Sequence, residues 1–189
     1  VTGQVIIRKA ENCMNDYIQK ITKTTKDYVI AVDTDSVYLN LDPIVQQIST
    51  KTKIADVTDF VNQVCEQKIQ PEFKKEMELL AANLGCKENK IFFKREAIAS
   101  TGMFIAKKRY ALLMYDLEGV RFKDPKLKIM GLEIIKSSTP SAVREKMLEA
   151  VNLMINGTQD DIHKFIAQFR SDFKSMPVEE ISFPRGMNG

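Results

Sequence analysis

Residues Tyr28 to Leu39 have the sequence YVIAVDTDSVYL, and the interpretation of the chain starts from this stretch. Two apolar, β-branched runs flank the polar residues 33–36, so the pattern predicts two strands joined by a hairpin bend over about residues 28–41. Ionised carboxylates are costly to desolvate unless a cation or hydrogen-bond donors meet them. Asp33 and Asp35 are therefore candidate ligands for Mg²⁺ or Mn²⁺ in metal-dependent phosphoryl chemistry. The alternative is an ordinary polar turn, because Asp and Ser are common turn residues.

The composition is typical of a globular protein. The chain has 189 residues, of which 44% are hydrophobic and 28% are charged, enough for one full domain or slightly more. No apolar run approaches the roughly 20 residues that span a bilayer, and the first residues lack a signal-peptide pattern. The chain opens on Val1 without an initiator Met, so it is either processed or cut from a longer protein, and we expect the second.

Cysteine and histidine usage argues against several kinds of site. Cys13, Cys65 and Cys86 are far apart and odd in number, which indicates a reducing compartment and no disulfide framework. His163 is the only histidine, so neither a Cys–His nucleophile pair nor a histidine-rich zinc site is supported. A phosphate-binding loop of the GxxxxGK type is also absent from the sequence.

Positive charge is concentrated in the middle of the chain. The formal net charge is only +3, yet residues 87–136 contain 12 Lys and Arg against six acids, which is +6 for that segment. Concentrated basic charge suits a polyanion, because neutralised phosphates release their counterions. The alternative is a solvated charged face, which is what charge runs usually are.

Apolar spacing predicts most of the helices. Residues 4–22, a short segment from Asp42-Pro43, and a long segment from about 56 to 84 have helical periodicity. Within the long segment we expect Pro71 to interrupt or kink the helix, and Gly85 to end it. Two further helices, from Ser138-Thr139-Pro140 to about 156 and from 158 to about 176, would form a helical hairpin around Gly157.

Strands are predicted between about residues 89 and 136. The candidate strands are 90–95, 109–115, 120–123 and 129–135, with a turn at 116–119. The last residues, 181–189, are expected to be a strand or an extended tail. Together the elements indicate an α+β fold, with an antiparallel sheet packed on helices and a helical part beginning near residue 137.

Several separated stretches resemble family B DNA polymerases, most closely the replicative polymerases of large tailed bacteriophages. DTDS at 33–36 resembles the third polymerase motif, and KKRY at 107–110 resembles the basic motif that grips the primer end of the duplex. Further likenesses occur, in the family's order, at 95–98 (REAI), 127–133 (LKIMGLE), 137–140 (SSTP) and 183–186 (FPRG). The resemblance covers nearly the whole chain.

The resemblance implies a role for each matching residue. It implies nucleotidyl transfer to a primer 3′ end with two Mg²⁺ or Mn²⁺ ions, with Asp35 as direct ligand, Asp33 as second carboxylate and Glu96 as supporting carboxylate from an adjacent strand. For Glu96, an ion pair with Arg95 or a neighbouring lysine is the alternative. The residues implied to contact DNA are Lys107, Lys108, Arg109, Tyr110, Lys126, Lys128 and Arg185.

The resemblance also implies a partial polymerase. Residues 1–137 would be the C-terminal part of the palm and residues 138–189 the first part of the thumb. The first metal-binding motif, the fingers, the exonuclease and the N-terminal domain would be supplied in cis or by a separate chain. Implied partners are primer–template DNA and deoxynucleoside triphosphates, with no membrane, in the cytoplasm of a host cell. We therefore expect the isolated chain to be inactive.

Two positions depart from the family pattern. Val32 stands where glycine usually precedes DTDS, and Lys94 stands where close relatives tend to carry an acid. Glycine permits close approach and unusual backbone angles. These departures motivate the alternative of a DNA-binding subunit or fragment of a split polymerase with an incomplete or vestigial metal site. A subunit of a split polymerase is expected to expose apolar surface on residues 4–22.

Overall fold

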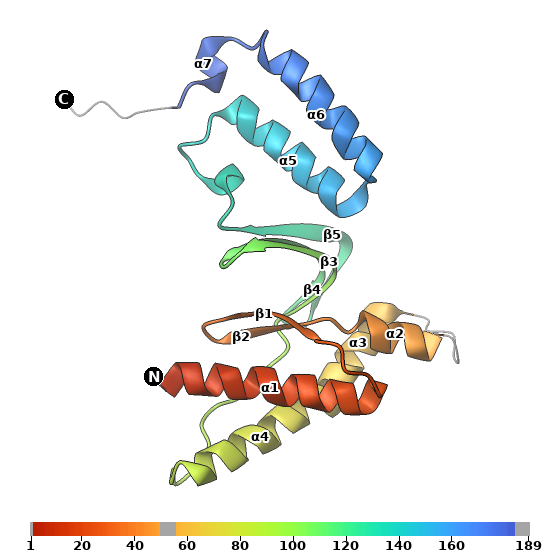
Figure 1. The fold of residues 1–189 in the computed structure, drawn as a ribbon, viewed down its shortest axis with the longest axis vertical. Coiled ribbons are helices and arrows are strands. Elements are labelled where there is room, and N and C mark those ends of the chain that lie inside the picture. The colour runs from red at the N-terminus through yellow and green to blue at the C-terminus, as the bar shows by residue number, and fades with distance from the viewer. Residues whose placement is uncertain (1, 50–55, 184–189) are drawn as a thin grey trace, which may run out of the picture. The chain divides into compact units, whose positions relative to one another are not determined.

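The computed structural model describes residues 2–49 and 56–183 and has the predicted α+β composition (Figure 1). The chain forms two compact units. The first comprises Val1–Ile98 with Tyr115–Phe122, and the second comprises Ala99–Met114 with Lys123–Gly189. The division falls within three strands, β3 (Ala97–Ala106), β4 (Arg109–Leu117) and β5 (Val120–Met130). None of the helices in these described ranges is long and apolar enough to cross a membrane.

The beginning of the first unit follows the prediction. Helix α1 (Thr2–Thr22) is followed by strands β1 (Val29–Asp33) and β2 (Ser36–Leu39), which pair antiparallel as a two-stranded sheet of their own. Helix α2 (Asp42–Ser49) then begins at the predicted Asp-Pro pair. The predicted hairpin is thus confirmed, but it does not share a sheet with the later strands.

The long helical segment contains a π-helical turn. Helix α3 (Val57–Val64) leads into the π-helical turn η1 (Cys65–Ile69) and then into α4 (Gln70–Asn83). The amide of Gln70 donates to the carbonyl of Cys65, five residues earlier. Because proline lacks an N–H and crowds the carbonyl four residues before it, a wider turn just ahead of Pro71 relieves that conflict. Gly85, with φ +70°, ends the helix as predicted.

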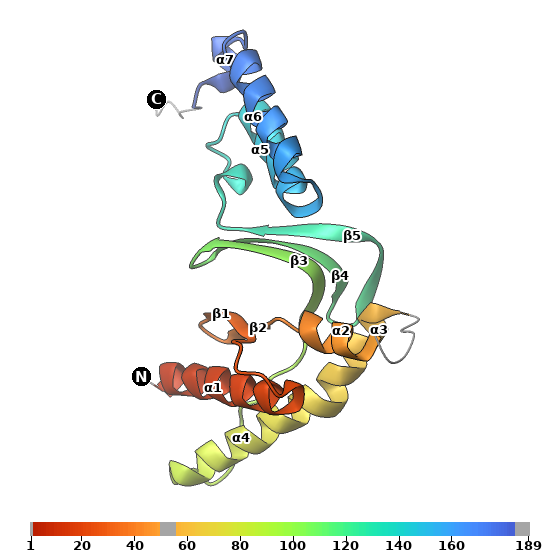
Figure 2. The same cartoon turned by 45° about the vertical axis from the view of Figure 1, so that its right-hand side comes forward.

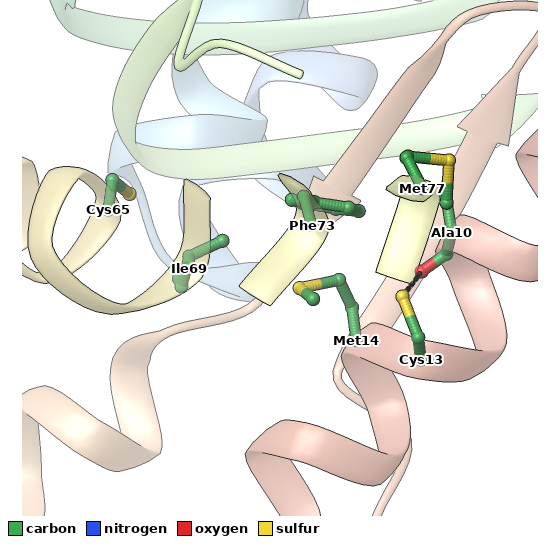
Figure 3. Packing of buried hydrophobic residues seen from close by; sticks show 7 residues of the cluster. All are labelled: Ala10, Cys13, Met14, Cys65, Ile69, Phe73 and Met77. Atoms are coloured by element: carbon green, nitrogen blue, oxygen red, sulfur yellow. Dashed lines mark hydrogen bonds between the residues drawn. The ribbon is translucent and has the colours of Figure 1, made fainter. Parts of the chain in front are cut away.

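Helices α1 and α4 share the main core of the first unit (Figures 1 and 3). Its buried residues are Ala10, Cys13, Met14, Cys65, Ile69, Phe73 and Met77. Lys9 of α1 reinforces the contact through an ion pair with Glu76 of α4, at 2.6 Å between Nζ and Oε2. This hydrogen bond raises the pKa of Lys9. Half-buried hydrophobic residues of β1 and β2 pack against the same core, which backs the hairpin with helices as expected.

A three-stranded sheet has the order β3-β4-β5, with β4 central (Figure 2). Strand β3 is Ala97–Ala106, β4 is Arg109–Leu117 and β5 is Val120–Met130. Strand β4 matches its prediction, β5 is longer than predicted, and β3 was not predicted. Pro125 is tolerated within β5 because this strand lies at the edge of the sheet.

Two predicted strands are wrong. Residues 90–95 form no strand, because Ile91 and Phe93 pack on the helical core and Phe93 stacks on Phe73 of α4, with ring centroids 4.6 Å apart. The segment 129–135 is also not a strand of its own, because only Ile129 and Met130 are extended, as the end of β5. Strand β5 ends at Met130, Gly131 adopts φ +65°, and a 3₁₀ turn η2 (Glu133–Ile135) follows.

The end of the second unit is helical. Helix α5 (Ser141–Asn156) begins one residue after Pro140, and α6 (Gln159–Phe173) packs against it as the predicted helical hairpin (Figure 1). Thr158 and Asp161 form a capping box at the predicted start of this second helix. A short helix, α7 (Val178–Ile181), precedes the predicted tail and overlaps it only at Ile181. Predictions for 184–189, including Arg185, lie outside the described residues.

Candidate functional site

The predicted metal-binding motif is the tip of the β1–β2 hairpin. Asp33 and Ser36 are opposite each other in the ladder, so the loop consists of Thr34 and Asp35 alone. Thr34 has φ +42°, an unusual angle for a β-branched residue. The amide of Asp35 donates to the carbonyl of Asp33, and the Thr34 hydroxyl lies 3.1 Å from Oδ1 of Asp33. This tight turn holds the two carboxylate residues at one end of the hairpin.

Helix α1 anchors the other end of the same hairpin. The side-chain oxygen of Asn15 accepts hydrogen bonds from the amides of Tyr28 and Val29, at 2.7 and 3.0 Å. The amide of Asn40 donates to the carbonyl of Tyr28 at 2.7 Å. Tyr28 is 1% exposed, and its hydroxyl bonds to Thr22 at 2.8 Å. These hydrogen bonds therefore fix the open end of the hairpin against α1.

The hairpin provides two of the oxygen ligands that a hard divalent cation needs. Asp35 is exposed and Asp33 is half-buried, and carboxylate oxygens are the donors that Mg²⁺ and Mn²⁺ prefer. Over residues 2–49 and 56–183, however, no three or more His, Cys, Asp or Glu side chains are grouped closely enough to hold a metal. The hairpin therefore supplies two carboxylates, and further ligands would have to come from water, substrate or other protein segments.

The backbone at Val32 is regular. Val32 lies opposite Val37 in the ladder. Its φ angle is not positive, unlike that of Thr34 in the turn. A glycine is thus not required at this position by the backbone of β1. Any effect of Val32 would come from its side chain.

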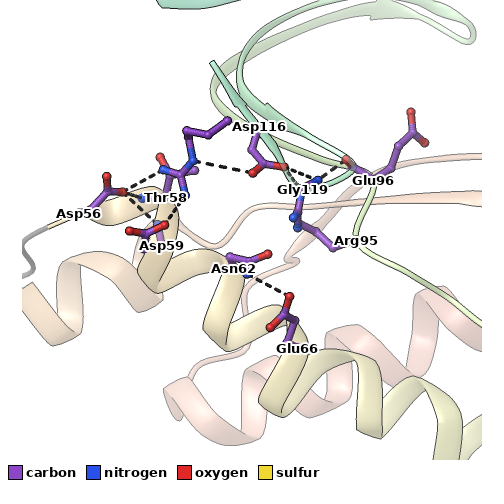
Figure 4. A network of polar contacts seen from close by, with 10 residues as sticks. Asp56, Thr58, Asp59, Asn62, Glu66, Arg95, Glu96, Asp116 and Gly119 are labelled. Carbon is purple, nitrogen blue, oxygen red and sulfur yellow. Dashed lines mark hydrogen bonds and ion pairs between the residues drawn. The ribbon is translucent and has the colours of Figure 1, made fainter. Parts of the chain in front are cut away.

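Glu96 lies directly before β3, and a buried ion pair fixes its neighbourhood (Figure 4). The guanidinium of Arg95 donates to Oδ1 of Asp116, and the amide of Gly119 donates to the same oxygen at 3.0 Å. The carbonyl of Glu96 accepts from the amide of Glu118 at 2.6 Å. In Figure 4 the Glu96 carboxylate points away from the Arg95–Asp116 pair. Arg95 therefore pairs with Asp116, and Glu96 lies one residue before strand β3, whereas the resemblance implied that it lies on a strand.

A second basic residue joins this network. Arg121 contacts Asp56 at 3.2 Å, Asp59, and Oδ2 of Asp116 at 3.7 Å. Asp56 also caps α3 by accepting the amides of Thr58 and Asp59. The hydrogen bond from Asp59, followed by that from Arg121, lowers the pKa of Asp56. The network joins the start of α3 to the β4–β5 turn within the first unit.

A polar hollow of about 590 Å³ lies beside this network. Its lining includes the acids Glu66, Glu96 and Glu118 and the bases Lys94 and Arg95. The Nε of Arg95 is buried without a hydrogen-bond partner. Lys94, the departure from the family pattern, thus shares this hollow with Glu96.

The predicted basic motif occupies the β3–β4 turn. Lys107 and Lys108 form a two-residue loop between the strands, and Lys108 has φ +60°. Lys107, Lys108 and Arg109 are exposed. Tyr110, in contrast, is 6% exposed and packs against Phe104, with ring centroids 5.6 Å apart. The turn can therefore present three cations to a polyanion, while Tyr110 supports it from the interior.

The remaining basic residues lie on β5. Lys126 is exposed and Lys128 is half-buried. Because β4 and β5 are joined by the short turn at Glu118 and Gly119, the start of β4 and the end of β5 lie at the same end of the sheet. Lys128 and Arg109 therefore contribute charge to the same region.

Two residues of these sites had no predicted role. Asp116 was predicted only as a turn residue, yet it is 3% exposed. Alternation along β4 is the signal that could have found it, since Tyr110, Leu112, Met114 and Asp116 are all buried. Gly131 was predicted within a strand, and its role at the basic turn depends on a contact that sequence spacing does not reveal.

Comparison with known proteins gives one consistent result. Residues 9–168 match the family described as Divergent Family B DNA polymerase. The chain is 31% identical to the DNA-directed DNA polymerase of Enterobacteria phage T4 over 193 aligned residues, which cover 96% of this chain and 22% of that protein. It is 33% identical to the DNA-directed DNA polymerase of Escherichia phage RB69 over 165 residues, covering 81% of this chain and 18% of the relative. The chain thus spans about a fifth of the length of these curated relatives.

Proposed function

Because this chain belongs to the divergent family B DNA polymerases, we propose that it supplies a carboxylate hairpin and a basic DNA-gripping turn to a DNA-templated DNA polymerase. The resemblance to phage polymerases inferred from the motifs is confirmed by both curated relatives. The observation that carries the proposal is the hairpin tip, where a two-residue turn keeps Asp33 and Asp35 together within the matched residues. We assign residues 1–137 to the palm and 138–189 to the first part of the thumb.

The hairpin carboxylates would hold the metal. Asp35, exposed in the turn, is the direct ligand in this proposal, and Asp33 completes the negative site beside it. Two bound divalent ions would activate the primer 3′-hydroxyl and stabilise the departing pyrophosphate. The two-residue turn of Thr34 and Asp35 keeps the two carboxylates adjacent. Glu96 is proposed as a supporting carboxylate, and the Arg95–Asp116 pair fixes the backbone next to it.

The basic turn would hold the duplex. Lys107, Lys108 and Arg109 contact phosphates, with Lys126 and Lys128 extending the basic region. Such contacts position a duplex without reading its sequence. Tyr110 is buried, so we assign it chiefly to support of the turn, with at most the edge of its ring facing DNA. Primer–template DNA and deoxynucleoside triphosphates are the proposed substrates.

The isolated chain is proposed to be inactive. It spans about a fifth of its curated relatives, and its described residues lack a group of three or more metal-ligating side chains. Templated extension therefore requires segments outside the chain, in cis or as a separate subunit. The same two observations favour a second candidate, a DNA-binding part of a split polymerase with an incomplete metal site.

Mn²⁺ binding in the presence of primer–template DNA tests the metal assignment. Free Mn²⁺ can be followed by electron paramagnetic resonance for the native chain, Asp35→Asn and Asp27→Asn. Asp27 is exposed and lies on the loop before β1, outside the turn, so it is a matched control. Saturable binding lost in Asp35→Asn and kept in Asp27→Asn would support a metal half-site formed by the hairpin itself. Equal, weak binding by all three would favour the second candidate.

The two departures from the family pattern distinguish the candidates in a complete polymerase. If Val32 and Lys94 weaken the site, Val32→Gly and Lys94→Asp should raise the rate of templated primer extension. An unchanged rate in both variants would argue against a vestigial site. Measurable extension by the isolated 189-residue chain would contradict the proposed inactivity.

A further inference from the structure

Gly131 makes an unusually close backbone contact with the basic turn. A Cβ atom on Gly131 would lie 2.0 Å from the carbonyl oxygen of Lys108, 3.1 Å from its carbonyl carbon and 3.3 Å from Cγ of Arg109. The first two atoms are backbone and cannot swing aside as a flexible side chain can. Any other residue at position 131 would therefore displace the turn or the end of β5.

The contact is separate from the backbone angle of this glycine. Gly131 has φ +65°, and Gly85 has φ +70°, so both lie in the left-handed region that side chains disfavour. A Cβ on Gly85 would meet no atom within 4 Å. Alanine at either position would incur similar conformational strain, but only alanine at 131 would also collide with the backbone of Lys108.

The contact joins the two basic segments of the second unit. Lys107, Lys108 and Arg109 lie at or next to the β3–β4 turn, and Lys128 precedes Gly131 near the end of β5. Like charges repel when they approach, so a basic cluster needs packing contacts that hold its backbone in place. The Gly131–Lys108 approach is such a contact, made by main-chain atoms alone.

We infer that Gly131 is a positioning residue for DNA binding, which holds the Lys107-Lys108 turn so that its cations act together with those of β5 on one duplex. This inference rests on the proposed function and adds to it a residue that touches no substrate. It predicts that position 131 influences how many phosphates the chain neutralises. A merely structural glycine would instead change only the amount of folded protein.

The salt dependence of duplex binding measures that number. Dissociation constants of the full chain for a primer–template duplex are determined over a range of KCl concentrations, for the native chain, Gly131→Ala, Gly85→Ala and the double variant Lys107→Ala/Lys108→Ala. Each lost phosphate contact lowers the slope of the logarithm of the dissociation constant against log[KCl] by about 0.9. We expect Gly131→Ala and the double lysine variant each to lower the slope by about 2, and Gly85→Ala to leave it unchanged.

Combining the changes tests whether Gly131 acts through the turn. Adding Gly131→Ala to the double lysine variant should lower the slope no further, because the same two contacts are already lost. A native slope in Gly131→Ala, or additive losses in the triple variant, would overturn the inference. A partly unfolded variant keeps the same slope as long as its folded fraction is constant across the salt series. Circular dichroism at each KCl concentration checks that this fraction is constant.

Two further measurements keep the inference testable whatever the binding data show. Hydrogen exchange in residues 106–110 should accelerate in Gly131→Ala relative to Gly85→Ala, and unchanged exchange would overturn the positioning role without reference to DNA. If Gly131→Ala fails to fold, Lys108→Ala and Lys108→Gly are compared. Equal salt-dependence slopes for these two variants mean that the contact at Gly131, and not the backbone preference of residue 108, fixes the turn. Unequal slopes would overturn the inference. If the double lysine variant binds DNA as the native chain does, the proposed DNA contact fails, while exchange still decides whether Gly131 holds the turn.

Discussion

Arg95 donates from its guanidinium to the carboxylate of Asp116, and both side chains are almost wholly buried, at 11% and 5% exposure. Asp116 also receives the Gly119 amide and lies near Arg121. Two cations and one amide therefore meet a single carboxylate. A buried ion pair contributes little relative to an apolar pair, but removing one partner leaves an uncompensated charge.

Asp116→Asn is therefore expected to destabilise the chain by about 3–5 kcal/mol, because Arg95 would remain buried without its counter-charge. Urea unfolding followed by circular dichroism measures the change. Asp124→Asn, at an exposed position of β5, serves as the control and should stay within about 0.5 kcal/mol of the native chain. A loss in Asp116→Asn no larger than in this control would contradict the assigned role of the pair.

The three thiols are expected to differ in reactivity. Burial raises the pKa of Cys13 to about 12 and that of Cys65 to about 11, and Cys86 is exposed. Since the thiolate is the reactive form, a disulfide reagent at pH 8 should label one thiol in the native chain and three in denaturant. Cys86→Ser should abolish the native labelling. Rapid labelling of a second thiol would show that the helical core opens readily.

The capping box of α6 is expected to respond to acid. The Thr158 hydroxyl, followed by its amide, lowers the pKa of Asp161. A carboxylate with a lowered folded pKa stabilises the fold above its unfolded value of about 3.9, and this contribution is lost as the pH falls through the folded value. The Thr158 amide resonance should accordingly titrate with a midpoint below the ordinary aspartate value. Asp160→Asn should preserve that titration and Asp161→Asn remove it, whereas a midpoint at or above 3.9 would be inconsistent with the hydrogen bonds.

Thr34→Gly is expected to stabilise the hairpin by about 0.5–1 kcal/mol. Thr34 has φ +42°, an angle that costs a β-branched residue energy and glycine very little. Urea unfolding of the variant shows whether its free energy of unfolding rises or falls. Ser36→Gly, at the first residue of β2, is the comparison and is expected to lower stability. Destabilisation by Thr34→Gly would mean that the threonine hydroxyl on Asp33 outweighs the backbone strain.

Local pattern was sufficient for the elements whose signals are contained in their own residues. The β1–β2 hairpin has two β-branched runs around a polar turn, and the α5–α6 hairpin has Pro140, Gly157 and a capping box. These features determine local conformation wherever the segment packs. The carboxylate turn was predicted for the same reason, whereas the basic residues 107–110 were identified through the family resemblance and no turn was predicted there.

Tertiary contacts decided the segments that were predicted wrongly or missed. Strand β3 (AIASTGMFIA) mixes the strand formers Ile, Thr and Phe with Ala and Gly, which are depleted in strands, and pairing with the apolar β4 determines its structure. Residues 90–95 look like a strand but pack on α4 through Phe93. Asp116 and Gly131 depend on partners distant in sequence, Arg95 and Lys108, which a single sequence does not identify.

The π-helical turn at Cys65–Ile69 has a consequence for how this chain can change in length. Val61, Cys65, Ile69, Phe73 and Met77 recur every four residues, and on a regular α-helix each such step drifts by about 40° around the axis. The wider turn absorbs one extra residue and keeps Phe73 and Met77 facing α1. A single-residue deletion within 65–69 would leave α4 in the same rotational setting, although Pro71 would then strain the regular helix. The same deletion between residues 72 and 76 would turn Met77 about 100° away from α1, so the helix tolerates the loss of a residue at the bulge far better than beyond it.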